Sequence, residues 1–417
     1  DSLDYHVGFP LYILNNQEFP GFKAWMHYSL SGSGEILNIV GLSIHSEQIL
    51  SMIQFGGILS VVGILKKISK EYKFFSIFFL SSPVLIFLVS SAKPQLLFIG
   101  ATSLSFAIVF FSYINNDQSS KSIFKKYIFI CFLLATAVSA KFTFILSSGI
   151  IALYFLPKLF KTKNYILIIF VPIIIYLITI FPLNLKKYLI YEGYLFNLIY
   201  PFPSHLFGYK GLYETITTCG YHGCFPYWII FPKDLGSFTE ALGFGSIIIL
   251  FAKNKKNKKF LYPFILIISY CLVAFKFGPN QPRWYLEPLI WLLIISAYSG
   301  IISGRIKKVL KVVISIQSLT CIFAIYYGVI FLSIGSTTFK IRDIVMKDNA
   351  SGYELYKWSN SKLKKDDVLI TTHRSNALSN VKTIPGNFLY YIRPDNINSK
   401  TYFQEIKKLK PNYILFY

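Results

Sequence analysis

The sequence predicts an α-helical polytopic membrane protein with a small external α/β domain at its C-terminal end. Of the 417 residues, 54% are hydrophobic and 18% are aromatic, which is more apolar surface than a soluble chain of this length buries and which lipid can cover. The apolar residues form long runs that are separated by short basic loops. The net charge of +23 is therefore spread over loops instead of being gathered on one soluble face, so we exclude nucleic acid as a partner.

Ten apolar segments are expected to cross or enter the membrane. They are 48–65, 74–92, 96–114, 127–139, 142–157, 164–185, 236–252, 260–276, 284–303 and 309–333. Segments 127–139 and 142–157 meet at Ser139-Ala140-Lys141, and both of their other ends are basic. Because one long helix would place those ends on opposite sides, we expect two short helices with an external apex.

Positive charge gathers in five of the connections between these segments. Together they contain nineteen Lys and Arg residues but only two acidic residues, Glu71 and Asp117. The five connections are 66–73, 115–126, 158–163, 253–259 and 305–311. Short loops rich in Lys and Arg stay on the cytoplasmic side. Residues 1–47, 93–95, 186–235, 277–283 and 334–417 are then outside. An external start requires one earlier helix, so we expect about eleven spans in the full protein.

The chain therefore divides into three regions. Residues 1–47 form a first external loop with helices along the interface, and residues 48–333 form the transmembrane domain with its large external loop 186–235. Residues 334–417 form an external domain.

That last region alternates helices with strands. Helices are expected around 352–364 and 400–409, and strands at Val368–Thr371 and Asn412–Phe416, a pattern typical of a small α/β domain. The final strand ends without a closing loop, so we expect further C-terminal sequence.

Two carboxylates, Asp1 and Asp4, open the first external loop. In a helix they share a face, at spacing i, i+3. An external carboxylate at the membrane surface can act as general base on an acceptor hydroxyl. The alternative is that both are ordinary loop acids that solvate the interface, which composition alone favours.

Four short motifs lie on the predicted external side. They are Asp1-Ser2-Leu3-Asp4-Tyr5-His6 followed by Pro10, Ser139-Ala140-Lys141-Phe142-Thr143, Tyr200-Pro201-Phe202-Pro203, and Gln281-Pro282-Arg283-Trp284-Tyr285-Leu286-Glu287-Pro288. Together with the topology and the external C-terminal domain, they resemble the GT-C superfamily of membrane glycosyltransferases. The resemblance is greatest to the branch of protein mannosyltransferases and lipid A aminoarabinose transferases, and it extends over nearly the whole chain.

The resemblance implies a catalytic base in the first loop. Asp1 is the first candidate for this base and Asp4 the second. Tyr5 and His6 are then candidates for contacting the acceptor or for supporting the first loop.

The resemblance also implies that Arg283 and Lys141 bind the phosphate of a lipid-linked donor, a role that suits a guanidinium. The alternative for Arg283 is an ion pair with Glu287 at i+4 while its head reaches the surface. The alternative for Lys141 is a helix-end anchor, although an ammonium between two membrane helices is by default a functional candidate.

Metal ligands are not evident. Many relatives carry an acid near residues 93–95, where this chain has Gln95. No other cluster has ligand spacing, so we expect no cofactor, and the sequence does not support a divalent metal. His222 lies between Cys219 and Cys224, and these two cysteines either form a small disulfide in an oxidising compartment or remain free.

The predicted activity is inverting transfer of a sugar from a polyprenyl-phosphate donor to an acceptor on the periplasmic or extracellular face of the inner (plasma) membrane. The acceptor is a glycan, a lipid or a protein, and membrane lipid is a further partner. The alternative is a transporter or flippase for lipid-linked saccharides, which requires polar residues deep in mid-helix. Gln317 is the clearest of the few present. A third interpretation, a polymerase or ligase of surface polysaccharide, differs in product length.

Overall fold

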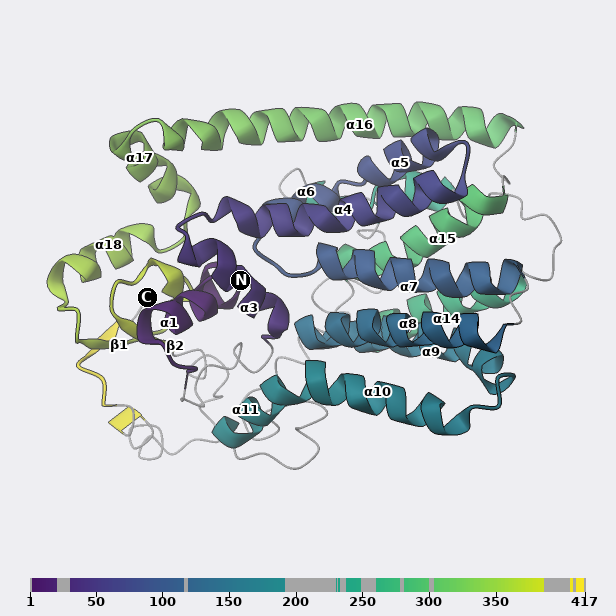
Figure 1. Ribbon diagram of the computed structural model, residues 1–417. Helices are drawn as coiled ribbons and strands as arrows, with labels where there is room; N and C mark the ends of the chain where they lie inside the picture. Colours follow the sequence, from purple (N-terminus) through teal and green to yellow (C-terminus); the bar gives the residue numbers. More distant parts are fainter. Residues whose placement is uncertain are drawn as a thin grey trace. The chain divides into compact units, whose positions relative to one another are not determined.

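The computed structural model describes residues 2–20, 31–115, 119–191, 230, 232, 238–248, 260–277, 281–299, 304–385, 406–407 and 410–415 (Figure 1). The chain divides into two compact units. The first comprises Asp1–Leu50, Phe181–Thr215 and Tyr326–Tyr417, and the second comprises Ser51–Ile180 and Ile216–Ile325. Predicted features at Asp1, 200–203, 219–224 and 400–405 lie outside the described residues.

The second unit is built from apolar helices. They are α4 (Gln48–Ile68), α5 (Tyr72–Leu80), α6 (Val84–Ser90), α7 (Leu96–Ile114), α8 (Ser120–Ala140), α9 (Ile145–Phe160), α10 (Tyr165–Thr179), α13 (Gly245–Ile248), α14 (Leu261–Phe277), α15 (Leu286–Ser299) and α16 (Gly304–Ser333), of which α4 and α16 extend beyond the unit at one end. Short 3-10 turns occur at η2 (Phe142–Phe144), η6 (Phe238–Glu240) and η9 (Pro282–Tyr285).

Among the described residues, five helices are long and apolar enough to cross a membrane, or up to seven if two interrupted pairs each count as one span. One such pair is α5 and α6, which are bent by 72°. Pro83, the N-cap of α6, has no N–H to continue the α5 ladder, which explains the break within predicted segment 74–92. Two helices, α8 and α9, meet near Lys141 as expected, but they are not short, since α8 begins at Ser120 and both Ser120–Ala140 and Phe142–Phe160 are long enough to cross a membrane.

Side-chain contacts define two ends of the helical unit. The Gln54 side-chain oxygen of α4 accepts the N–H groups of Gln95, Leu96 and Leu97, at 3.1, 2.9 and 3.4 Å. The starts of α4 and α7 therefore lie together, and the two helices lie side by side in Figure 1.

The opposite end carries the basic connections. Lys307, in the first turn of α16, forms an ion pair with Glu71 at 2.5 Å, which brings 66–73 beside 305–311. Lys158 donates to the Ser112 carbonyl near the end of α7, which brings 158–163 beside the start of 115–126. This grouping agrees with the predicted topology; predicted loop 253–259 lies outside the described residues.

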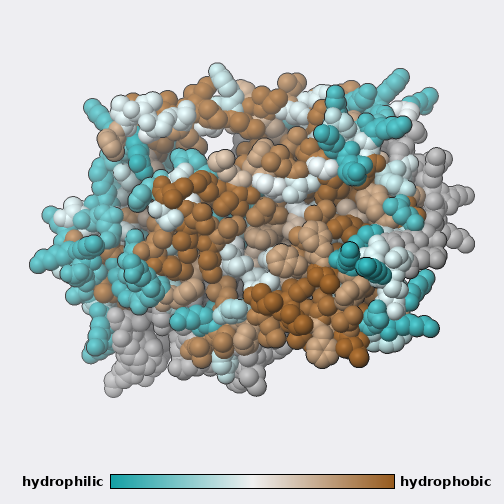
Figure 2. Space-filling view, in the orientation of Figure 1, coloured by the Kyte–Doolittle hydropathy of each residue, from teal (hydrophilic) through white to brown (hydrophobic). Residues whose placement is uncertain are grey.

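Apolar side chains cover the outside of this unit. Helix α10 buries none of its residues, and α16 exposes large side chains such as Leu319 and Phe323. Figure 2 shows hydrophobic atoms over the middle of α4 and α10 and hydrophilic atoms around the right-hand ends of these helices. A helix that is apolar all round is stable when lipid covers it, so the chain is a multi-pass membrane protein.

The first unit combines the two ends of the chain. Its elements are η1 (Ser2–His6, a turn of π-helix), α1 (Gly8–Asn16), α3 (Ser33–Ser43), α11 (Phe181–Tyr191), η10 (Ile334–Ser336), α17 (Phe339–Asn349), α18 (Tyr353–Lys362), β1 (Val368–Thr371), η11 (Asn376–Leu378), β2 (Lys382–Pro385) and β3 (Tyr413–Leu415). The three strands are parallel, in the order β2-β1-β3, with Ile370 opposite both Ile384 and Ile414.

The two faces of this sheet are covered by different parts of the chain. Leu369 packs with Tyr356 of α18, whereas Ile370 and Ile384 pack with Phe9 and Tyr12 of α1. Successive strand residues point to opposite faces, so α1 is the cover of the second face. The sequence predicts β1 and β3, but neither β2 nor this use of the first loop.

Candidate functional site

The structure places Asp4 in a buried polar cluster of the first unit. Its carboxylate is fully buried. Arg374 donates to Asp4 Oδ2 from Nε at 3.1 Å and from Nη2 at 3.0 Å, and Asn376 Nδ2 donates to Oδ1 at 3.2 Å. Both carboxylate oxygens of this predicted base therefore have partners from the C-terminal region. The sequence analysis does not identify Arg374 and Asn376, because neither lies in a recognisable motif.

Tyr5 and His6 lie next to this cluster. His6 is buried, with Nδ1 2.8 Å from Glu35 Oε1 of α3, and its carbonyl accepts from Asn38 Nδ2 at 3.0 Å. The Tyr5 ring lies 4.0 Å from the His6 ring. These contacts join η1 to α3, and the supporting role of Tyr5 and His6 stays a prediction.

A second cluster, in the helical unit, consists of Lys93, Arg283 and Phe87. Lys93 Nζ lies 4.8 Å and Arg283 Cζ 6.0 Å from the centre of the Phe87 ring, distances at which a cation is attracted by the ring. Lys93 is buried. The two cations come from predicted external connections 93–95 and 277–283, and α6 supplies the ring, so the fold brings them together at one end of the unit.

Lys93 is not among the residues that the motifs single out, because the connection 93–95 differs from that of many relatives at the neighbouring Gln95. A signal was present nonetheless: a lysine before Pro94, at the start of a membrane helix, in a connection otherwise free of charge. Buried ionisable residues at such positions are functional candidates by default.

Lys141 lies at the junction of α8 and η2 and is half-buried. The Phe144 ring of η2 is 6.3 Å from the Phe98 ring in the first turn of α7. The apex that carries Lys141 is therefore at the same end of the helical unit as the start of α7. This is the end expected to be external.

Glu287 points into the core of the helical unit. It is buried, Thr102 Oγ1 donates to its Oε1, and the Tyr270 hydroxyl donates to its Oε2 at 3.2 Å. Both oxygens of the Glu287 carboxylate therefore accept hydrogen bonds from other helices of the bundle. The ion pair between Arg283 and Glu287 stays a prediction.

The connection that precedes α7 carries polar groups with no described hydrogen-bond partner. They include Gln95 Oε1, and two further groups of this kind are Nε2 of the neighbouring Gln54 in α4 and Gln281 Oε1 before η9. Within the described ranges, no group of three or more His, Cys, Asp or Glu residues could hold a metal ion. The prediction of a reaction without metal or cofactor stays a prediction.

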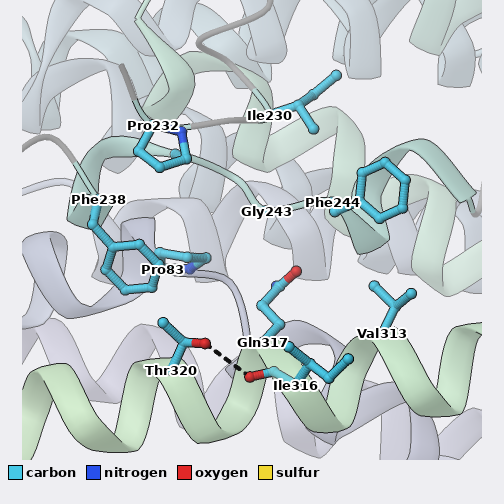
Figure 3. Close-up of a pocket in the computed structure, with 11 residues that line it drawn as sticks. Pro83, Ile230, Pro232, Phe238, Gly243, Phe244, Val313, Ile316, Gln317 and Thr320 are labelled. Atoms are coloured by element: carbon cyan, nitrogen blue, oxygen red, sulfur yellow. Dashed lines mark hydrogen bonds between the residues drawn. The ribbon is translucent and has the colours of Figure 1, made fainter. Parts of the chain in front are cut away.

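A cavity of about 240 Å³ lies between α16 and the segment around Gly243 (Figure 3). Its lining is mostly apolar, with Gln317 as the main polar group. Gln317 Nε2 donates to the Ser81 carbonyl at 2.6 Å, and Oε1 accepts from the Gly245 N–H at 3.3 Å. Gln317, the clearest of the few mid-helix polar residues, therefore joins segments of the helical unit.

Comparison with solved structures identifies the class of fold. The chain is similar to ArnT from Cupriavidus metallidurans, whose crystal structure contains undecaprenyl phosphate, with a TM-score of 0.56 and 10% sequence identity. The similarity covers 97% of this chain and 86% of that chain. The protein therefore has a GT-C-like polytopic membrane fold, as the motifs predict.

The chain belongs to the DUF1420 family. The DUF1420 N-terminal domain matches residues 1–346, and the DUF1420 C-terminal domain matches residues 347–417. Comparison with curated proteins found no match.

Proposed function

We propose that this protein is a glycosyltransferase that moves a sugar from a polyprenyl-phosphate donor to an acceptor on the external face of the membrane. The observation that carries the proposal is the placement of Lys93 and Arg283 over Phe87 at the predicted external end of the helical unit. The fold supports it, because it is similar to that of ArnT, which was solved with undecaprenyl phosphate bound.

The cationic cluster suits the leaving group of this reaction. When the bond from the anomeric carbon to the phosphate oxygen breaks, the lipid phosphate takes the electron pair and gains charge. Lys93 and Arg283 stabilise that charge in a site of low dielectric constant, and Lys141 is the third candidate at the same end. The phosphate needs no proton, so no general acid is required.

The acceptor hydroxyl must lose its proton as its oxygen attacks the anomeric carbon. A carboxylate of the first loop is the proposed base, with Asp1 as first candidate and Asp4 as second. Single displacement inverts the anomeric centre and needs one carboxylate. The acceptor, whether glycan, lipid or protein, receives the sugar.

The test uses the full-length protein in membranes with radiolabelled polyprenyl-phosphate sugars, following label that leaves the carrier. We expect Lys93→Met and Arg283→Met each to lower the transfer rate by about 100-fold, the usual effect of removing one group that stabilises transition-state charge. Lys307→Met is the matched control, because Lys307 also lies over a phenylalanine, Phe74, at 6.0 Å but at the opposite end of the unit.

Equal rates for Lys93→Met and Lys307→Met would contradict the assigned phosphate site. Protein-dependent movement of the intact labelled lipid across the bilayer, without loss of sugar, would instead establish the flippase. The base is identified by comparing the pH–rate profiles of Asp1→Asn and Asp4→Asn, because the acid limb is lost in the variant that lacks the base.

A further inference from the structure

Asp4 is connected to residues that are about 370 positions away in the chain. It is fully buried, and its described partners Arg374 and Asn376 both come from the segment between β1 and β2. Arg374 uses two nitrogens on one oxygen, while Asn376 takes the other oxygen. A paired carboxylate of this kind is rigid, and few of its lone pairs remain for taking a proton from a substrate.

The partners of Asp4 are themselves held in place. The buried Tyr356 hydroxyl of α18 donates to the His373 carbonyl at 3.1 Å and to Asn376 Oδ1 at 3.3 Å. This contact orients the Asn376 amide so that its nitrogen faces Asp4. Ser375 donates its N–H to His373 Nδ1 at 3.1 Å, which holds the backbone on either side of Arg374.

The next element of the first loop packs on the same segment. A Cβ built on Gly8, at the start of α1, would be 3.7 Å from the Asn376 Cβ and 3.1 Å from the Leu3 carbonyl oxygen. Phe9 follows and is buried against Ile370 and Ile384 of the sheet. Segment 2–9 is thus held by the C-terminal region through both an apolar contact and an ion pair in which the Asp4 carboxylate is buried while Arg374 remains partly exposed.

We infer that Arg374 and Asn376 are positioning residues: through Asp4, they fix the segment that immediately follows Asp1 in the chain. The inference rests on the proposed function and assigns Asp4 to positioning, which leaves Asp1 as the base. The C-terminal family domain then contributes to the transfer reaction, because its residues Arg374 and Asn376 hold the first residues of the first loop in position.

The test compares Arg374→Met with Lys382→Met in the full-length protein. Lys382 pairs with Glu18 at 2.9 Å and joins the same two regions, but both partners are substantially exposed, so it is a matched control. We expect Arg374→Met to lower kcat by about 100-fold with an unchanged KM for the donor, since misplacement of a reacting group costs about this much. Lys382→Met should change kcat by less than about fivefold.

Further variants distinguish a positioning role from a general loss of folding. Arg374→Lys should recover part of kcat, because one ammonium replaces one of the two nitrogen contacts. The double variant Asp4→Asn/Arg374→Met should be no slower than the slower single variant, as expected for residues that act through each other. Asp4→Asn should keep the acid limb of the pH–rate profile, because the base is still present.

Amide exchange of peptides within 2–16 provides a readout that does not need activity. It should increase in Arg374→Met and remain unchanged in Lys382→Met, with the helices of the other unit protected in both. Unchanged exchange in Arg374→Met, or loss of the acid limb in Asp4→Asn alone, would overturn the inference. If the wild type transfers no sugar, the proposed function fails while this exchange comparison still decides whether Arg374 holds the segment.

Discussion

His373 is buried beside Arg374, and its protonation state affects how the segment that carries Arg374 is held. Its Nδ1 accepts a hydrogen bond from the Ser375 N–H at 3.1 Å, so Nδ1 must carry no proton and the ring must be neutral. Burial lowers the pKa of His373 below 6.5. Gly352, at φ +78°, packs directly on the ring, where a Cβ would be 2.4 Å from Cε1. Only glycine suits that position, on both backbone and steric grounds.

The His373 segment should therefore weaken in acid. Because the pKa of His373 is lower in the folded than in the unfolded protein, its stabilisation is complete above pH 6.5 and is lost as the pH falls through the folded-state pKa. A tenfold difference between the two acid dissociation constants corresponds to about 1.4 kcal/mol. Amide exchange of Ser375 at pH 7.5 and 5.5, corrected for the intrinsic rate, measures this. His373→Asn keeps an acceptor that does not titrate, and an equal pH effect in that variant would contradict the assignment.

Helix α1 lies in one family domain and packs on the sheet of the other. It lies in the region that matches the DUF1420 N-terminal domain, but Phe9 and Tyr12 cover the sheet of the C-terminal domain through Ile370 and Ile384. Its hydrophobic pattern predicts an interfacial helix, since an apolar face alone does not specify its partner. The sheet is small, so the apolar area contributed by α1 is a large share of its core.

A fragment of residues 347–417 should consequently not fold alone. One face of its sheet would be exposed to water, and burial of Phe9 against it would be lost; deleting a buried Phe side chain alone costs about 3–5 kcal/mol. We expect no cooperative thermal transition for this fragment by circular dichroism, and we expect it to bind a hydrophobic dye. A cooperative transition without the dye signal would show that the α1 cover is dispensable.

At the scale of the whole molecule, charge and hydropathy determine how the chain crosses the membrane. The described contacts group four of the five basic connections at one end of the helical unit, as in the pairing of Lys307 with Glu71. Lys93 and Arg283 lie at the other end, above the same ring. This arrangement is the one that the positive-inside rule predicts.

Cysteine labelling tests the orientation directly. In a background without the five native cysteines, Lys70→Cys and Lys308→Cys should react with a membrane-impermeant maleimide only after permeabilisation. Lys365→Cys, in the C-terminal region, should react in intact cells. All three positions are exposed, so steric protection does not account for a difference. Labelling of Lys70→Cys in intact cells would reverse the proposed topology.

Much of the fold could be predicted from local pattern. Helices α4, α7, α8, α9, α14, α15 and α16 correspond to predicted apolar segments, and β1 and β3 to predicted strands. The break at Pro83 was missed, because segment 74–92 is apolar throughout and only the packing of its two halves separates them. The site was predicted less well: Arg283 and Lys141 carry motifs, whereas Lys93, Arg374 and Asn376 gain their roles from neighbours that are distant in sequence.

Composition and local pattern were enough to predict a multi-pass membrane protein, most of its helical segments and the end at which its basic residues gather. These properties depend on composition and spacing within single segments, and lipid leaves few alternatives to a helix. The pairs of residues that meet became known from the folded structure: Lys93 and Arg283 lie at one phenylalanine ring, and Asp4 pairs with Arg374 beside the sheet that α1 covers. Such contacts depend on the packing of segments that are hundreds of residues apart, which no local pattern encodes.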